Sequence, residues 1–346
     1  MSSTPVPALR SFIIGPGGVR IVLALMVVLS HLASVKIGRV AVMAFFILSG
    51  YWVTRMFEQK YSGEGFPIRF YISRFLRIWP FFSFTFLFFY LVFFFSPHPN
   101  DTEFLFGLTL FGVASDHLDV LGTSWSLDIE MQFYLLLPIL AQIASWCLVR
   151  QYRWPFLGIL LAITAIGWAV DFYFHLVLLP MYVLPFMLGM MIWKTRYRPS
   201  GSMALASAAG FVLFGVVLTT IPQTHFLVVN PHEWEWWYDS FAFVWAFLLF
   251  PFIAWNVWQR SSTIDKHLGN LSFPLYLVHF PIKVLLVEAL DSESLSTKLL
   301  ICAVSLGFAI LTYLLVDRPI EGWRTRYATR PVAEKSRAAK SAIGLL

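Results

Sequence analysis

The chain has 346 residues, of which 58% are hydrophobic and 13% are charged, and its mean hydropathy is +0.72. Soluble domains are about 45–50% apolar, so this composition excludes an ordinary soluble protein and predicts an all-α integral membrane protein. The net charge of +6 does not indicate nucleic acid, because the basic residues gather on one side of the predicted membrane topology.

Apolar runs long enough to cross about 30 Å of hydrocarbon recur along nearly the whole chain. Residues 104–113 are apolar but too few to cross, which predicts a re-entrant or interfacial piece. Cys147 and Cys302 lie inside apolar runs, so we expect neither a disulfide nor a metal site. We predict ten transmembrane helices, at residues 18–35, 40–57, 78–96, 124–148, 154–171, 176–194, 203–221, 239–258, 268–288 and 297–316.

The basic residues predict the orientation of these helices. With both termini in the cytoplasm, all but four of the 25 Lys and Arg residues lie on the cytoplasmic side, as the positive-inside rule requires. The exceptions are Lys36, Arg39, Lys283 and Lys298. The predicted organisation is a cytoplasmic N-terminal segment at 1–17, a transmembrane domain at 18–320, and a basic cytoplasmic tail at 321–346 that anionic lipid headgroups attract.

The first predicted helix carries two ionisable residues, Arg20 and His31. At 100° per residue they lie within about 20° of each other on one helix face, about 16 Å apart along the axis. Arg20 alone suits an interface anchor, and His31 alone suits a hydrogen bond to a neighbouring helix. Because histidine exchanges protons near neutral pH, a buried His31 that faces a cavity is also a candidate general base.

Two arginines stand at the cytoplasmic entrance of the third predicted helix. Arg74 and Arg77 are one helical turn apart and point the same way. Guanidinium groups in this arrangement bind phosphate in a forked geometry, although arginines here also suit positive-inside anchors.

Ser126, Glu130 and Tyr134 recur every four residues in the fourth predicted helix and therefore share one face. A carboxylate at the depth of Glu130 needs a partner, and we expect a histidine or arginine of another helix. Asp128 points away from this face and is expected to meet water at the interface. 

The ninth predicted helix contributes Tyr276, His279 and Lys283. His279 and Lys283 share a face, and His279 lies near the middle of the bilayer. Lys283 is expected to extend its ammonium group toward the outer interface.

Several of these residues stand in motifs that resemble those of the membrane-bound acyltransferase 3 family, bacterial integral-membrane enzymes that acylate surface carbohydrates. The four main matches are Arg20-x10-His31, Phe45-Phe-Ile-Leu-Ser49-Gly50-Tyr51, Arg74-x-x-Arg77 with Pro80, and Trp125-Ser-Leu-Asp-Ile-Glu130-Met-Gln-Phe-Tyr134. Two weaker matches follow at residues 271–281 and 317–319. The chain departs from the family pattern at residues 16–19 and 43–44.

The resemblance implies a multi-pass enzyme of the bacterial inner membrane that takes acyl-CoA, most often acetyl-CoA, from the cytoplasm. It implies a carbohydrate hydroxyl as the acceptor and no tightly bound cofactor. Direct transfer and a transient acyl-histidine both fit, and the oligomeric state stays open. The expected roles are phosphate binding by Arg20, Arg74 and Arg77, proton removal by His31 with Glu130 or His279 orienting it, and substrate binding by Trp125, Ser126, Tyr134, Tyr276 and His279.

Two other functions compete with this interpretation. A proton-coupled transporter or flippase would also use ten helices with buried His, Glu and Arg. It predicts an internal repeat with helices broken at corresponding places, which the sequence does not show by eye. A membrane scaffold without catalysis would leave the buried charges without a purpose.

Overall fold

The computed structural model of the chain describes residues 14–61, 66–94, 107–116, 119, 121–229 and 236–326. All regular elements in these ranges are helices, and the one isolated β-bridge there joins Val35 to Val229. The predicted all-α class is therefore confirmed. The helices are α1 (Pro16–Leu32), α2 (Gly38–Lys60), α3 (Phe66–Phe94), α5 (Val113–Asp116), α6 (Trp125–Val149), α7 (Arg153–Phe174), α8 (Leu179–Thr195), α9 (Gly201–Thr220), α10 (Pro222–His225), α11 (Trp236–Leu248), α12 (Phe250–Asn256), α13 (Thr263–Leu290), α14 (Leu295–Thr312) and the π-helix η1 (Tyr313–Asp317).

Seven helices of the described chain are long and apolar enough to cross a membrane: α2, α3, α6, α7, α9, α13, and α14 with its continuation to Arg326. The other three predicted crossings coincide with α1, α8 and the pair α11 and α12, which are shorter. These seven candidate crossings indicate a multi-pass helical membrane protein. The count of ten crossings and the cytoplasmic location of both termini stay predictions.

Two predicted helices differ in extent from the observed ones. The third begins at Phe66 rather than at residue 78, because the arginine segment is helical and Phe70 within it is fully buried. The eighth is broken between α11 and α12, since Pro251 at the start of α12 cannot donate a backbone hydrogen bond. The hydroxyl of Ser207 bridges the break by donating to the carbonyl of Leu248 and accepting from the amide of Phe252.

The predicted segments outside the transmembrane region are only partly described. Residues 1–13 and 327–346 lie outside the described residues, as do residues 104–106 of the predicted re-entrant piece. Residues 321–326 continue the last helix, and Arg324 there donates a hydrogen bond to Ser73 at 3.0 Å.

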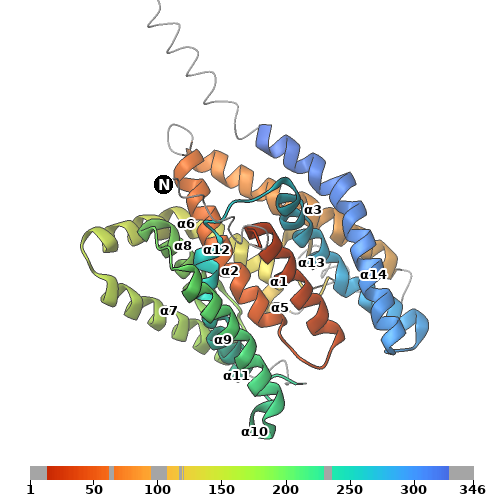
Figure 1. Cartoon of the computed structure of the whole chain (residues 1–346). Coiled ribbons are helices and arrows are strands. Elements are labelled where there is room, and N and C mark those ends of the chain that lie inside the picture. Colours follow the sequence, from red (N-terminus) through yellow and green to blue (C-terminus); the bar gives the residue numbers. More distant parts are fainter. Residues whose placement is uncertain are drawn as a thin grey trace, which may run out of the picture.

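Helices α1 and α2 lie between two groups of helices. In Figure 1, α7, α8, α9 and α11 gather on one flank, and α3, α13 and α14 gather on the other. Helix α2 packs closely on α8 through two glycines, Gly50 against the backbone of Phe186 and Gly189 against the backbone of Ile47. Most large side chains of α2 are consequently buried, so α2 forms the centre of the bundle.

The start of α1 is fixed by a carboxylate from α13. Asp265 accepts hydrogen bonds from the backbone amides of Gly17 at 3.0 Å and Gly18 at 2.7 Å. These amides belong to the first turn of α1, where they have no partner inside the helix. A side chain at Gly17 would overlap the backbone of Asp265. The contact therefore sets the position of Arg20, one turn further along α1.

Candidate active site

Two cavities lie at opposite ends of α1 and share two lining residues, Val42 and Tyr276. The inner cavity, of about 560 Å³, includes Arg20 near the start of α1. The outer cavity, of about 830 Å³, includes His31 in the last turn of α1. The names follow the predicted orientation of the helices. Because Val42 and Tyr276 line both cavities, we call this pair the neck between them.

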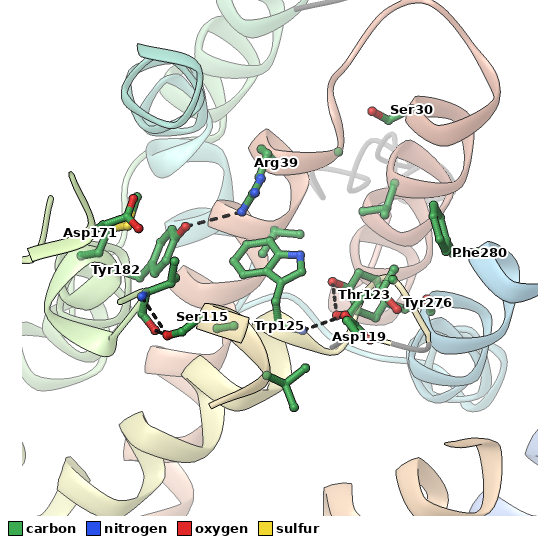
Figure 2. A pocket seen from close by; sticks show the side chains of 18 of the residues that line it. Ser30, Arg39, Ser115, Asp119, Thr123, Trp125, Asp171, Tyr182, Tyr276 and Phe280 are labelled. Carbon is green, nitrogen blue, oxygen red and sulfur yellow. Dashed lines mark hydrogen bonds between the residues drawn. The ribbon is translucent and has the colours of Figure 1, made fainter. Parts of the chain in front are cut away.

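The outer cavity is lined by aromatic rings and by charged groups. The guanidinium of Arg39 lies 4.1 Å from the centre of the Trp125 ring and donates to the hydroxyl of Tyr182 at 3.5 Å. Figure 2 shows Arg39 between these two rings. Aromatic faces with interspersed polar groups suit a ring-shaped polar ligand. The other aromatic and charged residues of this lining are Asp119, Trp168, Asp171, Phe172, His175, Tyr276 and Phe280.

The carboxylate of Asp119 fixes the start of α6 through hydrogen bonds. It accepts hydrogen bonds from the amides of Trp125 and Leu121, each at 3.1 Å. Burial raises the pKa of the Asp119 carboxyl, and these hydrogen bonds oppose the rise. The contacts fix Trp125 at the first position of α6, where its ring faces the cavity (Figure 2).

His31 lies beside a second histidine. Its ring centre is 5.2 Å from that of His279 and 5.0 Å from that of Phe280. His279 is 1% exposed, and its Nδ1 lies 2.8 Å from the carbonyl oxygen of Tyr276. Because a carbonyl only accepts, Nδ1 carries the proton, and Nε2 is left as a buried acceptor with no partner among the described residues.

Glu130 belongs to the inner cavity. Its carboxylate accepts hydrogen bonds from Ser49 at 2.5 Å and from the hydroxyl of Tyr134 at 2.6 Å. The shared face predicted for Ser126, Glu130 and Tyr134 is confirmed, since all three line this cavity. Two partners were predicted for His31, and of these only His279 lies beside it. Glu130 instead links the fourth family motif to the second through its hydrogen bond with Ser49.

The three predicted phosphate-binding arginines line the inner cavity in different environments. Arg77 forms an ion pair with Asp317 at 3.1 Å. Arg74 is 4% exposed, and its nearest polar partners are the sulfur of Met56 at 3.3 Å and the hydroxyl of Ser73 at 3.5 Å.

Arg20 makes no hydrogen bond or ion pair with the described residues, although Glu130 lies within electrostatic range of it. Neither Arg20 nor Arg74 is neutralised by a carboxylate in direct contact within the described chain. These two guanidinium groups can therefore receive an anion, whereas Arg77 already has one.

Tyr276 occupies the neck through hydrogen bonds to the start of α6. Its hydroxyl lies 2.8 Å from the hydroxyl of Ser126 and donates to the carbonyl of Thr123 at 3.1 Å. Four of the five predicted substrate-binding residues line the two cavities, and the fifth, His279, lines neither. Trp125 lines the outer one, Tyr134 and Ser126 line the inner one, and Tyr276 lines both.

The expectation that Asp128 faces water is wrong. Asp128 is fully buried, accepts from the amide of Ala114 at 3.1 Å and accepts from the side chain of Gln132 at 3.0 Å. Gln132 in turn accepts from the amide of Leu179 at 2.8 Å. The pair ties α5, α6 and α8 together, because buried backbone groups that lack a helical partner need one from a side chain.

Sequence reasoning missed three residues of the site. Asp265 and Asp119 cap helices, and no nearby motif points to those contacts. Asp317 lies in the weak match at residues 317–319, but that match does not indicate that Asp317 is the partner of Arg77.

The ammonium group of Lys283 lies 5.8 Å from the centre of the Phe280 ring.

The fold and the site define a helical, multi-pass membrane protein with ionisable residues in two neighbouring cavities. A family model described as an acyltransferase domain (Acyl_transf_3) matches residues 13–316, nearly the whole chain. The chain therefore belongs to the membrane-bound acyltransferase 3 family, as the motifs indicated, and it is an acyltransferase. Comparisons with curated proteins and with solved structures gave no significant match.

Proposed function

We propose that this protein moves an acyl group, most simply acetyl, from cytoplasmic acyl-CoA to a hydroxyl of a carbohydrate on the outer side of a bacterial inner membrane. The observation that carries the proposal is the pair of cavities at opposite ends of α1, whose linings share Val42 and Tyr276. One cavity presents guanidinium groups without an anion, and the other presents aromatic rings and a histidine.

The inner cavity suits the donor. Arg20 and Arg74 offer charged donors that phosphate binds strongly, and the remaining lining along α2 is largely apolar. An extended pantetheine arm would lie along that lining, with the thioester at the neck. Arg77 supports the site by holding α3 against η1 through Asp317.

The outer cavity suits the acceptor. Aromatic rings such as Trp125 and Tyr182 offer flat faces to a sugar, and Asp119 and Asp171 offer acceptors to its hydroxyls. Of the two ionisable residues of the first family motif, His31 lines this cavity and Arg20 does not, so His31 is the proposed general base.

The proposed step is a direct transfer. The sugar hydroxyl gives its proton to His31 while its oxygen attacks the thioester carbonyl carbon. The carbon–sulfur bond then breaks, and the CoA thiolate leaves with the proton that His31 has held. The neutral imidazole of His279 stands beside His31 with its free Nε2 and can orient the His31 ring.

The proposal is tested by supplying membranes with radiolabelled acetyl-CoA and measuring label in surface polysaccharide. Wild type should transfer label and His31→Ala should not, at equal expression. His225→Ala is the matched control, because His225 is exposed in α10 and lines neither cavity. Transfer by His31→Ala at the wild-type rate would contradict the role of His31. A protein that carries unmodified glycan and transfers no label would be a transporter or flippase.

A further inference from the structure

A cluster of arginines and tryptophans stands at the end of the inner cavity far from the neck, on the predicted cytoplasmic side. We call it the arginine–tryptophan cluster, and its members are Arg55, Arg196, Arg198, Trp52, Trp193 and Trp258. Arg196 and Arg198 come from the loop between α8 and α9. Arg55 and Trp52 come from the last turns of α2.

The cluster is a packed unit. The guanidinium of Arg196 lies 3.5 Å from the centre of the Trp193 ring, and that of Arg198 lies 4.0 Å from the centre of the Trp258 ring. The two tryptophan rings are stacked, with centres 6.1 Å apart. The indole nitrogen of Trp258 donates to the carbonyl of Tyr197 at 2.9 Å, which fixes the loop in place.

The three arginines surround the same part of α2. Arg55, Arg196 and Arg198 all lie within electrostatic range of Tyr51, whose ring packs on Trp258 with centres 5.4 Å apart. Arg55 itself lies 5.3 Å from the centre of the Trp52 ring. Like charges held together in this way repel each other unless an anion stands between them.

None of the three arginines pairs with an acidic side chain of the described chain. The carboxylate nearest in the sequence to Arg55, Glu58, already accepts from the ammonium of Lys194 and from the indole nitrogen of Trp193 at 2.7 Å. The side chain of Arg55 donates to Gln59 at 3.2 Å and lies close to the hydroxyl of Tyr51, and neither group is an anion at neutral pH. Stacking leaves the N–H edges of Arg196 and Arg198 free, and both residues are exposed.

The cluster adjoins the inner cavity through one of its members. Trp52 lines that cavity, as does Gln259, the neighbour of Trp258. The lining along α2 runs from Val42 at the neck to Met56, next to Arg55. At 1.5 Å per residue this distance is about 20 Å, which is comparable to an extended pantetheine arm.

We infer that the arginine–tryptophan cluster binds the phosphorylated adenine nucleotide of the acyl-CoA donor. The inference rests on the proposed function, since it places the far end of the same ligand. Three guanidinium groups match the several phosphate charges of that nucleotide, and guanidinium–phosphate pairs form forked hydrogen bonds. Trp52, whose side chain lines the inner cavity, offers an aromatic ring for stacking to the adenine ring. Arg20 and Arg74 then hold the phosphate nearest the pantetheine arm, deeper in the cavity.

The test measures binding of acetyl-CoA to the full chain in nanodiscs of neutral phosphatidylcholine. The double variant Arg196→Gln plus Arg198→Gln should weaken binding at least about tenfold, the loss of one charged hydrogen bond. Adenosine 3′,5′-bisphosphate should compete with acetyl-CoA for wild type and fail to compete for the double variant. The matched control is Arg150→Gln, an arginine 5.9 Å from the Trp146 ring at the cytoplasmic end of α6 and away from both cavities.

Each outcome decides a different claim. Wild-type affinity in the double variant would overturn the inference and leave the proposed function intact, provided that Arg74→Gln still weakens binding. An effect of the double variant only in nanodiscs that contain phosphatidylglycerol would assign the cluster to lipid headgroups and also overturn the inference. No acetyl-CoA binding by a folded wild type would contradict the proposed function itself. Unchanged melting temperatures identify folded variants.

Discussion

The imidazole rings of His31 and His279 lie 5.2 Å apart and are tilted by 46° to each other. Residues from α1 and α13 thus meet beside the outer cavity, just above the neck. The proton on Nδ1 of His279 is held by a backbone carbonyl, so its Nε2 can accept a hydrogen bond from His31. This arrangement makes His279 a positioning residue for the proposed base.

Replacing His279 should slow transfer without weakening donor binding. His279→Ala is expected to lower kcat about 100-fold, the lower end of what acid–base catalysis contributes, and to leave KM for acetyl-CoA unchanged. His279→Gln should recover part of the rate, because its amide oxygen can accept in place of Nε2. His267→Ala serves as the control on the same helix, since His267 bonds to Tyr313 away from both cavities. Full activity in His279→Ala would remove His279 from the site.

Arg74→Gln should weaken binding of the acyl donor and leave the other steps unchanged. Because Arg74 is buried at the inner cavity without an ion pair in the described chain, its loss should raise KM for acetyl-CoA about tenfold, one charged hydrogen bond. Steady-state kinetics at several donor concentrations measure the change. Arg69→Gln, on the same helix and outside both cavities, should behave as wild type. An unchanged KM in Arg74→Gln would leave Arg74 as a topology anchor.

Arg77→Gln should lower stability. The variant leaves the carboxylate of Asp317 buried without its partner, at a cost of about 3 kcal/mol, because that side chain is 3% exposed. Thermal unfolding of the purified protein measures the loss. Adding Asp317→Asn to Arg77→Gln should restore part of the melting temperature. If Arg77→Gln keeps the wild-type melting temperature and only raises KM, Arg77 binds the donor directly.

Gly189→Ala should loosen the contact between α2 and α8. The added carbon would overlap the carbonyl oxygen of Ile47, so the helices must separate, which costs about 1–3 kcal/mol. Gly158→Ala is the control, because an added carbon there meets nothing within 4 Å. It should be neutral or stabilising by about 0.5–1 kcal/mol. Equal melting temperatures for both variants would contradict the close approach of α2 and α8 at Gly189.

The sequence predicted those features that depend on periodicity. Hydrophobic runs located the helices, and four-residue spacing placed Ser126, Glu130 and Tyr134 on the face that lines the inner cavity. The positions of Arg20 and His31 at opposite ends of one helix followed from spacing as well. These features depend on local geometry, which neighbouring residues determine.

The partners of the buried charges could not be predicted in the same way. Arg77 pairs with Asp317, and His31 packs on His279, across most of the chain length. Such pairs depend on which helices are neighbours, and periodicity carries no information about that. Asp128 was misjudged for the same reason, because its partner Ala114 belongs to a short helix outside the predicted crossings.

The most direct measurement of the central claim uses sealed, inverted membrane vesicles, whose cytoplasmic face is outside. Radiolabelled acetyl-CoA is added outside, and labelled carbohydrate is then divided into enclosed and accessible fractions by an added carbohydrate-degrading enzyme. We expect label in enclosed carbohydrate with wild type, none with His31→Ala, and none when the donor is supplied only inside. Labelled carbohydrate on the same side as the donor, or equal labelling by His31→Ala, would contradict transfer between the two cavities.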